Sequence, residues 1–138
     1  MEEKKTKIAV SAFIIKDGKI LLLKRRTPPE KWGPPAGRVR EKEILIDAVI
    51  REVKEEANID IKVLMPITSW SGEHGGEMLS SIGFLCEYVW GEVKVAEEHS
   101  EARWFNIEEL KNEEVTHDVK DFIRAKEIKN LFDNQKIY

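Results

Sequence analysis

Residues Gly37 to Ile59, GRVREKEILIDAVIREVKEEANI, decide the fold, because the second half of this stretch repeats apolar residues at the period of a helix. Glu52 and Glu56 lie one turn apart on the apolar side. Like charges at this spacing weaken a helix by roughly 0.2–0.5 kcal/mol, and partial burial costs more unless an opposite charge is close. We therefore expect a helix from Leu45 to Ala57 that holds a divalent cation. At about 100° per residue, the predicted apolar arc contains Leu45, Ala48, Val49, Ile50, Val53 and Ala57.

The competing interpretation is an ordinary solvated helix face, which is typical of runs that alternate Glu with Lys or Arg. Three features favour the cation site. Both carboxylates lie on the apolar side of the helix, a stiff Trp-Gly-Pro-Pro-Ala-Gly segment precedes it at residues 32–37, and Glu43 stands where it can fold back onto Arg51. Together they describe a loop-helix-loop site for a cation.

This stretch resembles the Nudix box, a pattern of Gly, five residues, Glu, seven residues, Arg-Glu, an aliphatic residue, any residue, Glu-Glu, any residue, Gly and an aliphatic residue. Only the second glycine is missing, where Asn58 stands instead. A pattern fixed at this many positions is far more specific than a lone glycine motif. The matching residues are Gly37, Glu43, Arg51, Glu52, Val53, Glu55, Glu56 and Ile59.

The flanking segments agree with the resemblance. Leu21 to Arg26 is similar to the family's second strand, residues 32–37 to its Trp-x-x-Pro-Gly-Gly loop, and Ala102 to Leu110 to its Trp-Phe strand and following helix. Two loop positions depart from the pattern, because Ala36 replaces a Gly and Lys42 stands where a Gly often occurs. If either backbone needs a positive φ, the loop must adjust.

The departure at Asn58 has a simple interpretation. The residue after a helix often adopts a left-handed backbone, and Asn is the usual substitute for Gly there. We therefore expect the helix to end normally.

The resemblance implies a bound Mg2+, with Mn2+ as a possible substitute. Glu52 and Glu56 become the principal ligands, with Glu55 and the Gly37 carbonyl as further ligands. These hard oxygen donors suit Mg2+ rather than zinc. The pair of Arg51 and Glu43 becomes a brace that fixes the ligands. The alternative for that pair is a surface salt bridge worth about 0–1 kcal/mol.

The implied reaction is attack of water on a phosphorus atom of a nucleoside diphosphate linked to another group. In this family the general base is either a box glutamate or one on a later loop, so the candidates are Glu52, Glu97, Glu98 and Glu101, of which we favour Glu98. A solvated acidic loop is the competing interpretation of the segment AEEHSE. The predicted catalytic set is Glu43, Arg51, Glu52, Glu55 and Glu98.

Substrate recognition is less clearly encoded. The predicted substrate-binding residues are Arg25, Trp32 and Arg38. Lys24, Arg25 and Arg26 can meet phosphates at the end of a strand, and Trp32 or Trp70 can stack on a base. Each has an alternative, because strand ends are often basic for solubility alone and a Trp more often belongs to a core or a rim.

Size and composition limit the function classes. The chain of 138 residues fits a single domain, residues 1–138. A net charge of −3 argues against a general affinity for nucleic acid. The single Cys86 lies in an apolar run and predicts a buried, inert thiol and a reducing, cytoplasmic location. His74, His99 and His117 have no metal-ligand spacing and are expected at the surface.

No run approaches the roughly 20 apolar residues that cross a bilayer, so no membrane association is expected. The apolar run near the N-terminus is short, and Asp17-Gly18 follows it, so it predicts the first strand of a hairpin.

The remaining elements follow from periodicity and turn residues. Strands are expected at 7–15, 19–25, 61–69, 78–90 and 103–105, and helices at 107–111 and 118–132 in addition to 45–57. The proline-rich segment 27–37 should be irregular and the glycine-rich segment 71–77 mobile. This is an α+β pattern, a mixed β-sheet with flanking helices. The resemblance implies the Nudix three-layer α/β/α sandwich.

The leading functional hypothesis is a Mg2+-dependent Nudix pyrophosphohydrolase of a soluble nucleotide, such as a (deoxy)nucleoside triphosphate, a nucleotide sugar or a dinucleotide polyphosphate. A catalytically weak nucleotide-binding regulator is the alternative, although it has less reason to keep the repelling carboxylates. Processing of RNA 5′ ends is disfavoured by the acidic balance. A homodimer is compatible with the closing helix and the strand edges, but no sequence feature requires it.

Overall fold

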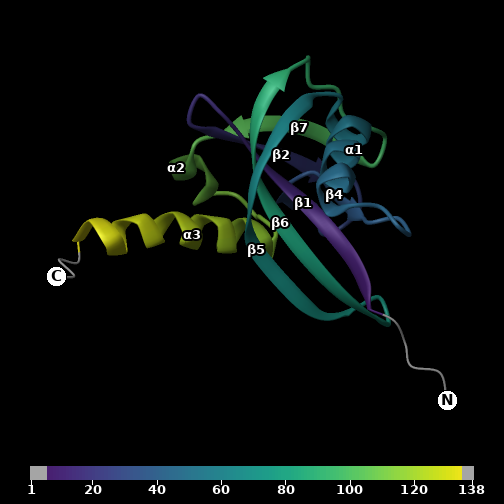
Figure 1. Cartoon of the computed structure of the whole chain (residues 1–138). Helices are drawn as coiled ribbons and strands as arrows, with labels where there is room; N and C mark the ends of the chain where they lie inside the picture. Colours follow the sequence, from purple (N-terminus) through teal and green to yellow (C-terminus); the bar gives the residue numbers. More distant parts are fainter. Residues whose placement is uncertain (1–5, 135–138) are drawn as a thin grey trace.

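The computed structural model describes residues 6–134, with side chains described for residues 6–125. A mixed β-sheet forms its centre, and helices flank the sheet (Figure 1). This confirms the expected fold class. The elements in chain order are β1 Lys7–Lys16, β2 Lys19–Arg25, β3 Trp32–Gly33, β4 Ala36–Arg38, α1 Leu45–Ala57, β5 Asp60–His74, β6 Glu77–Trp90, β7 His99–Phe105, α2 Ile107–Leu110 and α3 His117–Asn134.

The sheet has the strand order β3-β2-β1-β6-β5, with β4 paired to β1 and β7 paired to β2. β1 and β6 are parallel, from Lys7 opposite Leu79 to Ile15 opposite Glu87, and the other pairs of strands are antiparallel. The predicted hairpin of β1 and β2 is confirmed. Its turn residues Asp17 and Gly18 both have positive φ. A two-residue turn needs this backbone conformation if its twist is to match the twist of the two strands.

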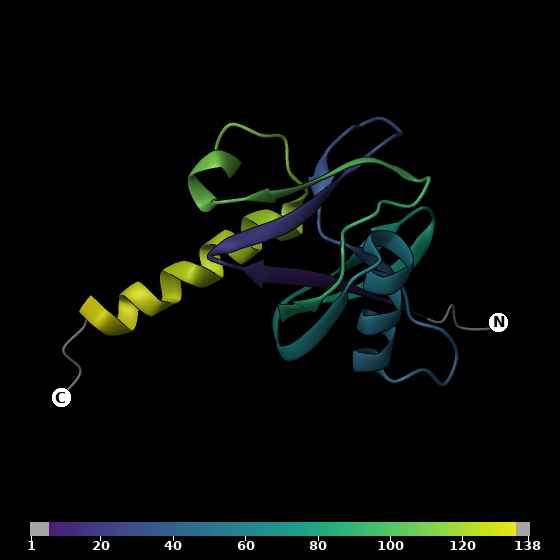
Figure 2. The same ribbon diagram turned by 90° about the horizontal axis from the view of Figure 1, so that it is seen from above.

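Alternation along the central strands creates two apolar layers, because successive side chains of a strand point to opposite faces. On β1, Ala12 and Ile14 face α1, whereas Phe13 faces the other side and stacks on Phe122 of α3, with ring centroids 4.8 Å apart. The two helices thus cover opposite faces of the sheet, and a view turned by 90° shows them apart (Figure 2). This arrangement is a three-layer α/β/α sandwich.

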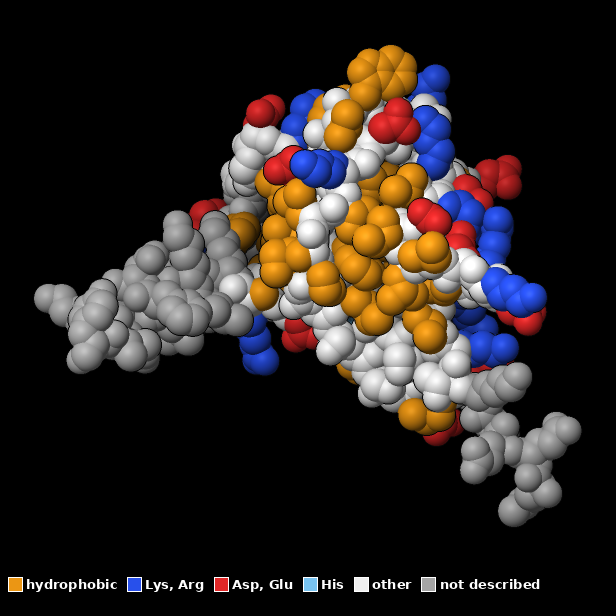
Figure 3. All heavy atoms as spheres, in the orientation of Figure 1, with side chains coloured by type: hydrophobic (Ala, Val, Ile, Leu, Met, Phe, Trp, Pro, Cys, Tyr) orange, Lys and Arg blue, Asp and Glu red, His pale blue; other side chains and the backbone are white. Residues whose placement is uncertain are grey.

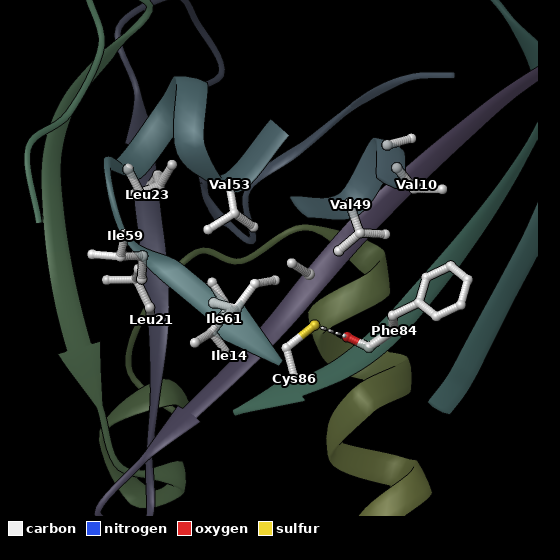
Figure 4. Close-up of a cluster of buried hydrophobic side chains, with 13 residues drawn as sticks. Val10, Ile14, Leu21, Leu23, Val49, Val53, Ile59, Ile61, Phe84 and Cys86 are labelled. Carbon is white, nitrogen blue, oxygen red and sulfur yellow. Dashed lines mark hydrogen bonds between the residues drawn. The ribbon is translucent and has the colours of Figure 1, made fainter. Parts of the chain in front are cut away.

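The layer beneath α1 holds Cys86, which is fully buried as predicted (Figure 4). Its Sγ lies 3.5 Å from the Phe84 carbonyl oxygen, and burial raises the pKa of the thiol to about 12. Val49 and Val53 of α1 point into the same layer, toward Ile61 of β5. The helix therefore has a well-packed face from which its polar residues can be positioned.

Two predicted loops are corrected by the structure. The segment 71–77 was expected to be mobile, but β5 and β6 remain paired as far as His74 opposite Glu77, and only Gly75 and Gly76 form the turn. The proline-rich segment 27–37 contains the short strands β3 and β4, because it pairs with β2 and β1. Both segments lacked strand periodicity, and both are ordered by pairing with distant strands.

The apolar arc of α1 is narrower than predicted. Ile50 is 42% exposed, whereas Ala48, Val49, Val53 and Ala57 are buried. Leu64 and Met65 of β5 are exposed as well. Hydrophobic side chains gather over the middle of the face that Figure 3 shows. In the part of the chain that the structure describes, no helix is long and apolar enough to span a membrane.

The three departures from the Nudix pattern differ in their backbone. Asn58 ends α1 in the left-handed region at a φ of 63°, as predicted, and its N–H donates to the Lys54 carbonyl oxygen. Lys42 also has a φ of 63°, so the loop before Glu43 keeps a conformation that glycine adopts without strain. Ala36 has no positive φ and needs no adjustment.

Candidate active site

Helix α1 carries the acidic residues of the site on the side that faces β4. Ile44, the residue before the helix, is extended, and Asp47 places a negative charge in the first turn, where it is favourable. Both predicted ends of the helix, Leu45 and Ala57, are confirmed. Because the buried face packs on the sheet, the neighbouring Glu52 and Glu56 are directed at the short strand β4 rather than at bulk solvent.

Glu56 is the most buried carboxylate in the described residues, with 6% of its surface exposed. Its Oε2 accepts a hydrogen bond of 2.8 Å from the Ala36 backbone N–H. Burial raises the pKa of Glu56 to about 8, the hydrogen bond lowers it, and the nearby carboxylates of Glu52 and Glu98 raise it further. The structure thus gathers negative groups that lack sufficient positive charge.

Glu52 lies directly against Gly37. A Cβ atom added to Gly37 would collide with the Glu52 carboxyl group, so only glycine leaves room for it. Burial raises the pKa of Glu52, and the Arg51 guanidinium opposes that effect. The structure therefore places Gly37 and Glu52, two of the predicted metal ligands, next to each other.

Arg51 connects the loop to the helix. Its Nε and Nη2 donate to the two oxygens of Glu43 at 2.7 and 2.8 Å, and its Nη1 donates to Glu52 at 2.8 Å and to Glu55 at 3.2 Å. A further bond of 3.1 Å reaches the Arg38 carbonyl oxygen. The hydrogen bonds from Arg51 are the main reason that the pKa of Glu43 falls to about 2.

Glu55 differs from its two helix neighbours. Its side chain is 50% exposed, and it pairs with Arg40 at 3.4 Å as well as with Arg51. The carboxylates of Glu52 and Glu56, which Glu98 joins, are called the acidic group below. The structure places Glu55 beside this acidic group but on its solvent side, next to Arg40 and Arg51.

The segment before β7 places the carboxylate of Glu98 next to Glu56. Backbone N–H groups of Lys94 and Ala96 donate to the carbonyl oxygens of Ala57 and Glu56 at 3.0 and 3.2 Å. These bonds satisfy carbonyls at the helix end and set the distance of the following residues from the helix. As a result Glu98 and His99 meet Glu56, and one ligand atom of each of the three lies within 4.8 Å of the others.

The other two candidate bases lie outside this group of three. The Glu97 backbone carbonyl accepts a bond of 2.6 Å from the Arg26 side chain. Glu101 pairs with Lys24 in the ladder of β2 and β7, and its side chain is exposed. Among the later-loop glutamates that the structure describes, Glu98 is the one that joins Glu56.

The expectation that all three histidines lie at the surface is wrong for His99. This residue is 9% exposed, and its Nδ1 has no hydrogen-bond partner among the described residues. Burial lowers the pKa of its imidazole, although the nearby Glu98 charge raises it. Sequence spacing could not reveal His99 as a neighbour of Glu56, because 43 positions separate them; a glutamate next to a histidine at the start of a strand was the available signal.

These donors fit a divalent cation. Carboxylates crowded closely enough to raise the pKa of Glu56 need positive charge. The neighbouring His99 adds a buried Nδ1 that has no hydrogen-bond partner among the described residues. Oxygen ligands suit Mg2+ and Mn2+, and imidazole suits transition metals.

A cleft leads away from the acidic group. One part, of about 420 Å3, is lined by Glu56 and His99, and a neighbouring part, of about 510 Å3, is lined by Gly37 and Trp70. Arg25 lines both parts. The volumes suit a small molecule.

The predicted substrate-binding residues separate in the structure. Arg38 lines the cleft and forms an ion pair of 3.0 Å with Glu77. Trp32 does not line it: the side chain is 4% exposed, and its ring meets Phe105 edge to face at 4.9 Å between centroids. The prediction that Trp32 stacks on a base is therefore corrected, because pairing of β3 with β2 turns the indole into the core.

Trp70, unlike Trp32, has its ring in the wall of the cleft. It lies on β5, lines the cleft and has its ring centroid 5.3 Å from that of His117 on α3. The two rings form one wall of the cleft.

The chain is similar in sequence and in structure to known proteins of one family. The model of the NUDIX domain matches residues 5–126. An ADP-ribose pyrophosphatase of Methanocaldococcus jannaschii is 34% identical over 125 residues, which cover 86% of this chain and 74% of that protein. The crystal structure of a MutT protein from Methanosarcina mazei Go1 superposes with a TM-score of 0.79 at 32% identity, covering 94% of this chain and 99% of the other.

Other relatives are much longer than the matched region. The NAD-capped RNA hydrolase NudC of Stutzerimonas stutzeri is 37% identical over 102 residues, which cover 70% of this chain but 36% of that protein. The chain thus spans about a third of that relative's length.

Proposed function

The chain belongs to the Nudix hydrolase family, and from this membership we propose that it hydrolyses a diphosphate bond in a nucleoside diphosphate linked to another group, with the help of a divalent cation. The observation that carries the proposal is that Glu56 lines the cleft and that the carboxylates of Glu52 and Glu98 lie close enough to it to raise its pKa. Such a concentration of negative charge is costly in the free protein. It becomes favourable when a cation binds between the protein and a phosphate chain.

In this proposal Glu52 and Glu56 hold the cation, with the Gly37 carbonyl and Glu55 as further ligands, and the cation is Mg2+ or Mn2+. When bound, it neutralises charge on the phosphates and lowers the pKa of the attacking water. The exposure and arginine contacts of Glu55 support a supplementary role for that residue.

Arg51 and Glu43 position the ligands. Because one guanidinium holds Glu43, Glu52 and the Arg38 carbonyl together, the loop and the helix keep a fixed distance. A carboxylate held in this way loses little freedom when it binds a cation. The pair thus has a larger role than a surface salt bridge, a view that its 17% and 14% exposed side chains support.

We propose Glu98 as the general base that takes a proton from the attacking water. Its side chain is exposed to water, and one of its carboxylate oxygens lies within 4.8 Å of a Glu56 carboxylate oxygen, so it is close to the proposed cation.

The cleft suggests how the rest of the substrate lies. Arg25 lines both parts of the cleft and can bind a phosphate. Arg38 lines the part that contains Trp70. Trp70 and His117 offer ring faces to a base. A nucleotide would then extend from the acidic group toward α3.

The name of the Methanocaldococcus jannaschii relative supports testing ADP-ribose first. The panel should also contain nucleoside triphosphates, other nucleotide sugars, dinucleotide polyphosphates and an NAD-capped RNA beside free NAD. The net charge of −3 favours the free nucleotide over the RNA. Hydrolysis in 18O-labelled water identifies the phosphorus atom that is attacked.

Variants of the two key carboxylates test the proposal. Glu98→Gln should lower kcat by about 10²–10⁴-fold, the range for loss of a general base. The matched control is Glu101→Gln, which removes a neighbouring exposed carboxylate outside the cluster. If Glu56→Gln leaves turnover unchanged, the cation site is wrong, and if Glu98→Gln does so, only the assignment of the base is wrong.

A further inference from the structure

We propose that His99 supplies a nitrogen ligand to the cation held by the acidic group, so that the site has mixed oxygen and nitrogen donors and binds Mn2+ in preference to Mg2+. This inference rests on the proposed cation-dependent function. It adds a ligand that the Nudix-box pattern does not contain, because His99 lies 40 residues beyond the end of that pattern.

The first support is the position of the imidazole. A ring nitrogen of His99 lies within 4.8 Å of carboxylate oxygens of both Glu56 and Glu98, and His99 lines the same part of the cleft as Glu56. Glu56 comes from α1, Glu98 from the turn before β7 and His99 from the first residue of β7, and the backbone bonds of Lys94 and Ala96 to α1 hold these segments together. The imidazole therefore faces the place where a cation would meet Glu56.

The second support is an unsatisfied atom. His99 is 91% buried, since 9% of its surface is exposed, and its Nδ1 lacks a hydrogen-bond partner in the described structure. Buried polar atoms in native proteins nearly always have a partner, so each exception requires an explanation such as a bound ion. A ligand role explains why a polar ring is kept in this position.

The ladder of β2 and β7 shows how the sequence produces this placement. Arg25 is opposite His99, but the register shifts between Lys24 and Arg25. Irregularities of this kind redirect side chains at the ends of strands. Arg25 is the positive group near His99 and Glu98 the negative one, so a cation at this site must be drawn by Glu98 and Glu56 against Arg25.

Nitrogen donation has a chemical consequence. Mg2+ strongly prefers oxygen ligands and releases its water reluctantly. Mn2+ also suits oxygen ligands, but as a transition-metal ion it binds an imidazole nitrogen more strongly than Mg2+ does. A site with a histidine should therefore favour Mn2+ more than a site built from carboxylates alone.

Electron paramagnetic resonance of bound Mn2+ tests the inference without any turnover. The probe is Mn2+ added to the protein without substrate and without a histidine tag, and the readout is electron spin-echo modulation from a directly coordinated 14N nucleus. The double variant His74→Asn with His117→Asn leaves His99 as the sole histidine of the sequence. The modulation should persist in this variant and should change to the 15N pattern when histidine is labelled with 15N.

Replacement of His99 gives a second measurement. His99→Asn should abolish the modulation and weaken Mn2+ binding by about tenfold or more, while the Kd for Mg2+ changes by less than about threefold. His117→Asn is the matched control, because His117 lines the cleft but is not one of the three clustered donors.

The outcomes separate this inference from the proposed function. If Mn2+ binds to the double variant in a Glu56-dependent way but shows no nitrogen modulation, the proposed role of His99 is wrong. The proposal of a cation-dependent hydrolase is then unaffected. Absence of Mn2+ and Mg2+ binding overturns both. If His99→Asn fails to fold, the double variant still decides, because it leaves His99 unchanged.

Discussion

Arg51 and Glu43 form a two-pronged ion pair in which Nε and Nη2 of the guanidinium bind the two carboxylate oxygens at 2.7 and 2.8 Å. This geometry is the strongest arrangement available to an arginine and a carboxylate. It joins the loop after β4 to the middle of α1, and the same guanidinium continues to Glu52. Stability and site geometry are thus linked through one side chain.

Glu43→Gln should lower the free energy of unfolding at neutral pH and have little effect in strong acid. The pKa of Glu43 is lowered from 4.5 to about 2, so its contribution is complete above pH 4.5 and disappears as the pH falls toward 2. Urea unfolding of both proteins between pH 2 and pH 7 measures the difference. Glu41→Gln, at an exposed neighbouring position, is the control. An equal difference at pH 2 and pH 7 would contradict the prediction.

Gly37→Ala should destabilise the protein by about 1–3 kcal/mol, the usual cost of forcing a side chain into filled space. The new methyl group would occupy the position of the Glu52 carboxyl group, which must then move away from β4. Thermal unfolding and Mn2+ titration would both register the change. Gly33→Ala is the control, because the nearest atoms to its methyl group would belong to Thr116, from 3.0 Å, rather than to an acidic residue of the site. A variant with unchanged metal affinity would show that the contact of Glu52 with Gly37 is dispensable.

Glu56→Gln should stabilise the protein in a chelator at pH 9, by on the order of 1–3 kcal/mol. The pKa of Glu56 is raised to about 8, so the native protein loses stability as the pH rises from 4.5 through 8, and the glutamine variant avoids this loss. Adding Mn2+ should reverse the order, because only the carboxylate gains from the ion. Melting temperatures at pH 5 and pH 9 test this, with the half-exposed Glu55→Gln as control. A glutamine variant that is less stable in both conditions would be inconsistent with charge crowding.

Trp70→Leu should raise KM about 5- to 150-fold with little change in kcat, because loss of base stacking removes about 1–3 kcal/mol of binding. The ring lines the cleft beside His117 and lies outside the acidic group. Steady-state kinetics on the best substrate of the panel provide the measurement. Trp90→Leu is the matched control, since Trp90 is 69% exposed and does not line this cleft. Equal KM values for the two variants would remove Trp70 from base recognition.

Local sequence signals predicted the elements that depend on local chemistry. The helix from Leu45 to Ala57 has both predicted ends, because apolar spacing and Asn58 define it without distant contacts. The hairpin at Asp17-Gly18 is equally local. The Nudix pattern extended this success to the three-layer fold.

The failures concern contacts that join distant segments. Trp32 enters the core because β3 pairs with β2, and Ile50 is exposed because the sheet covers only part of the predicted arc. His99 reaches Glu56 through backbone bonds made by residues 94 and 96, which carry no pattern of their own. Periodicity describes one element at a time and therefore could not place these side chains.

The bonds that tie Lys94 and Ala96 to the end of α1 hold the acidic residues in place independently of the segment between them. The hairpin of β5 and β6 lies between those anchors, and its turn at Gly75 and Gly76 is next to His74 on the rim of the cleft. Residues inserted at that turn would reshape the entrance while the spacing of Glu56 and Glu98 stayed the same. A lineage could thus acquire new substrates by lengthening one turn, and an engineer could graft recognition loops there.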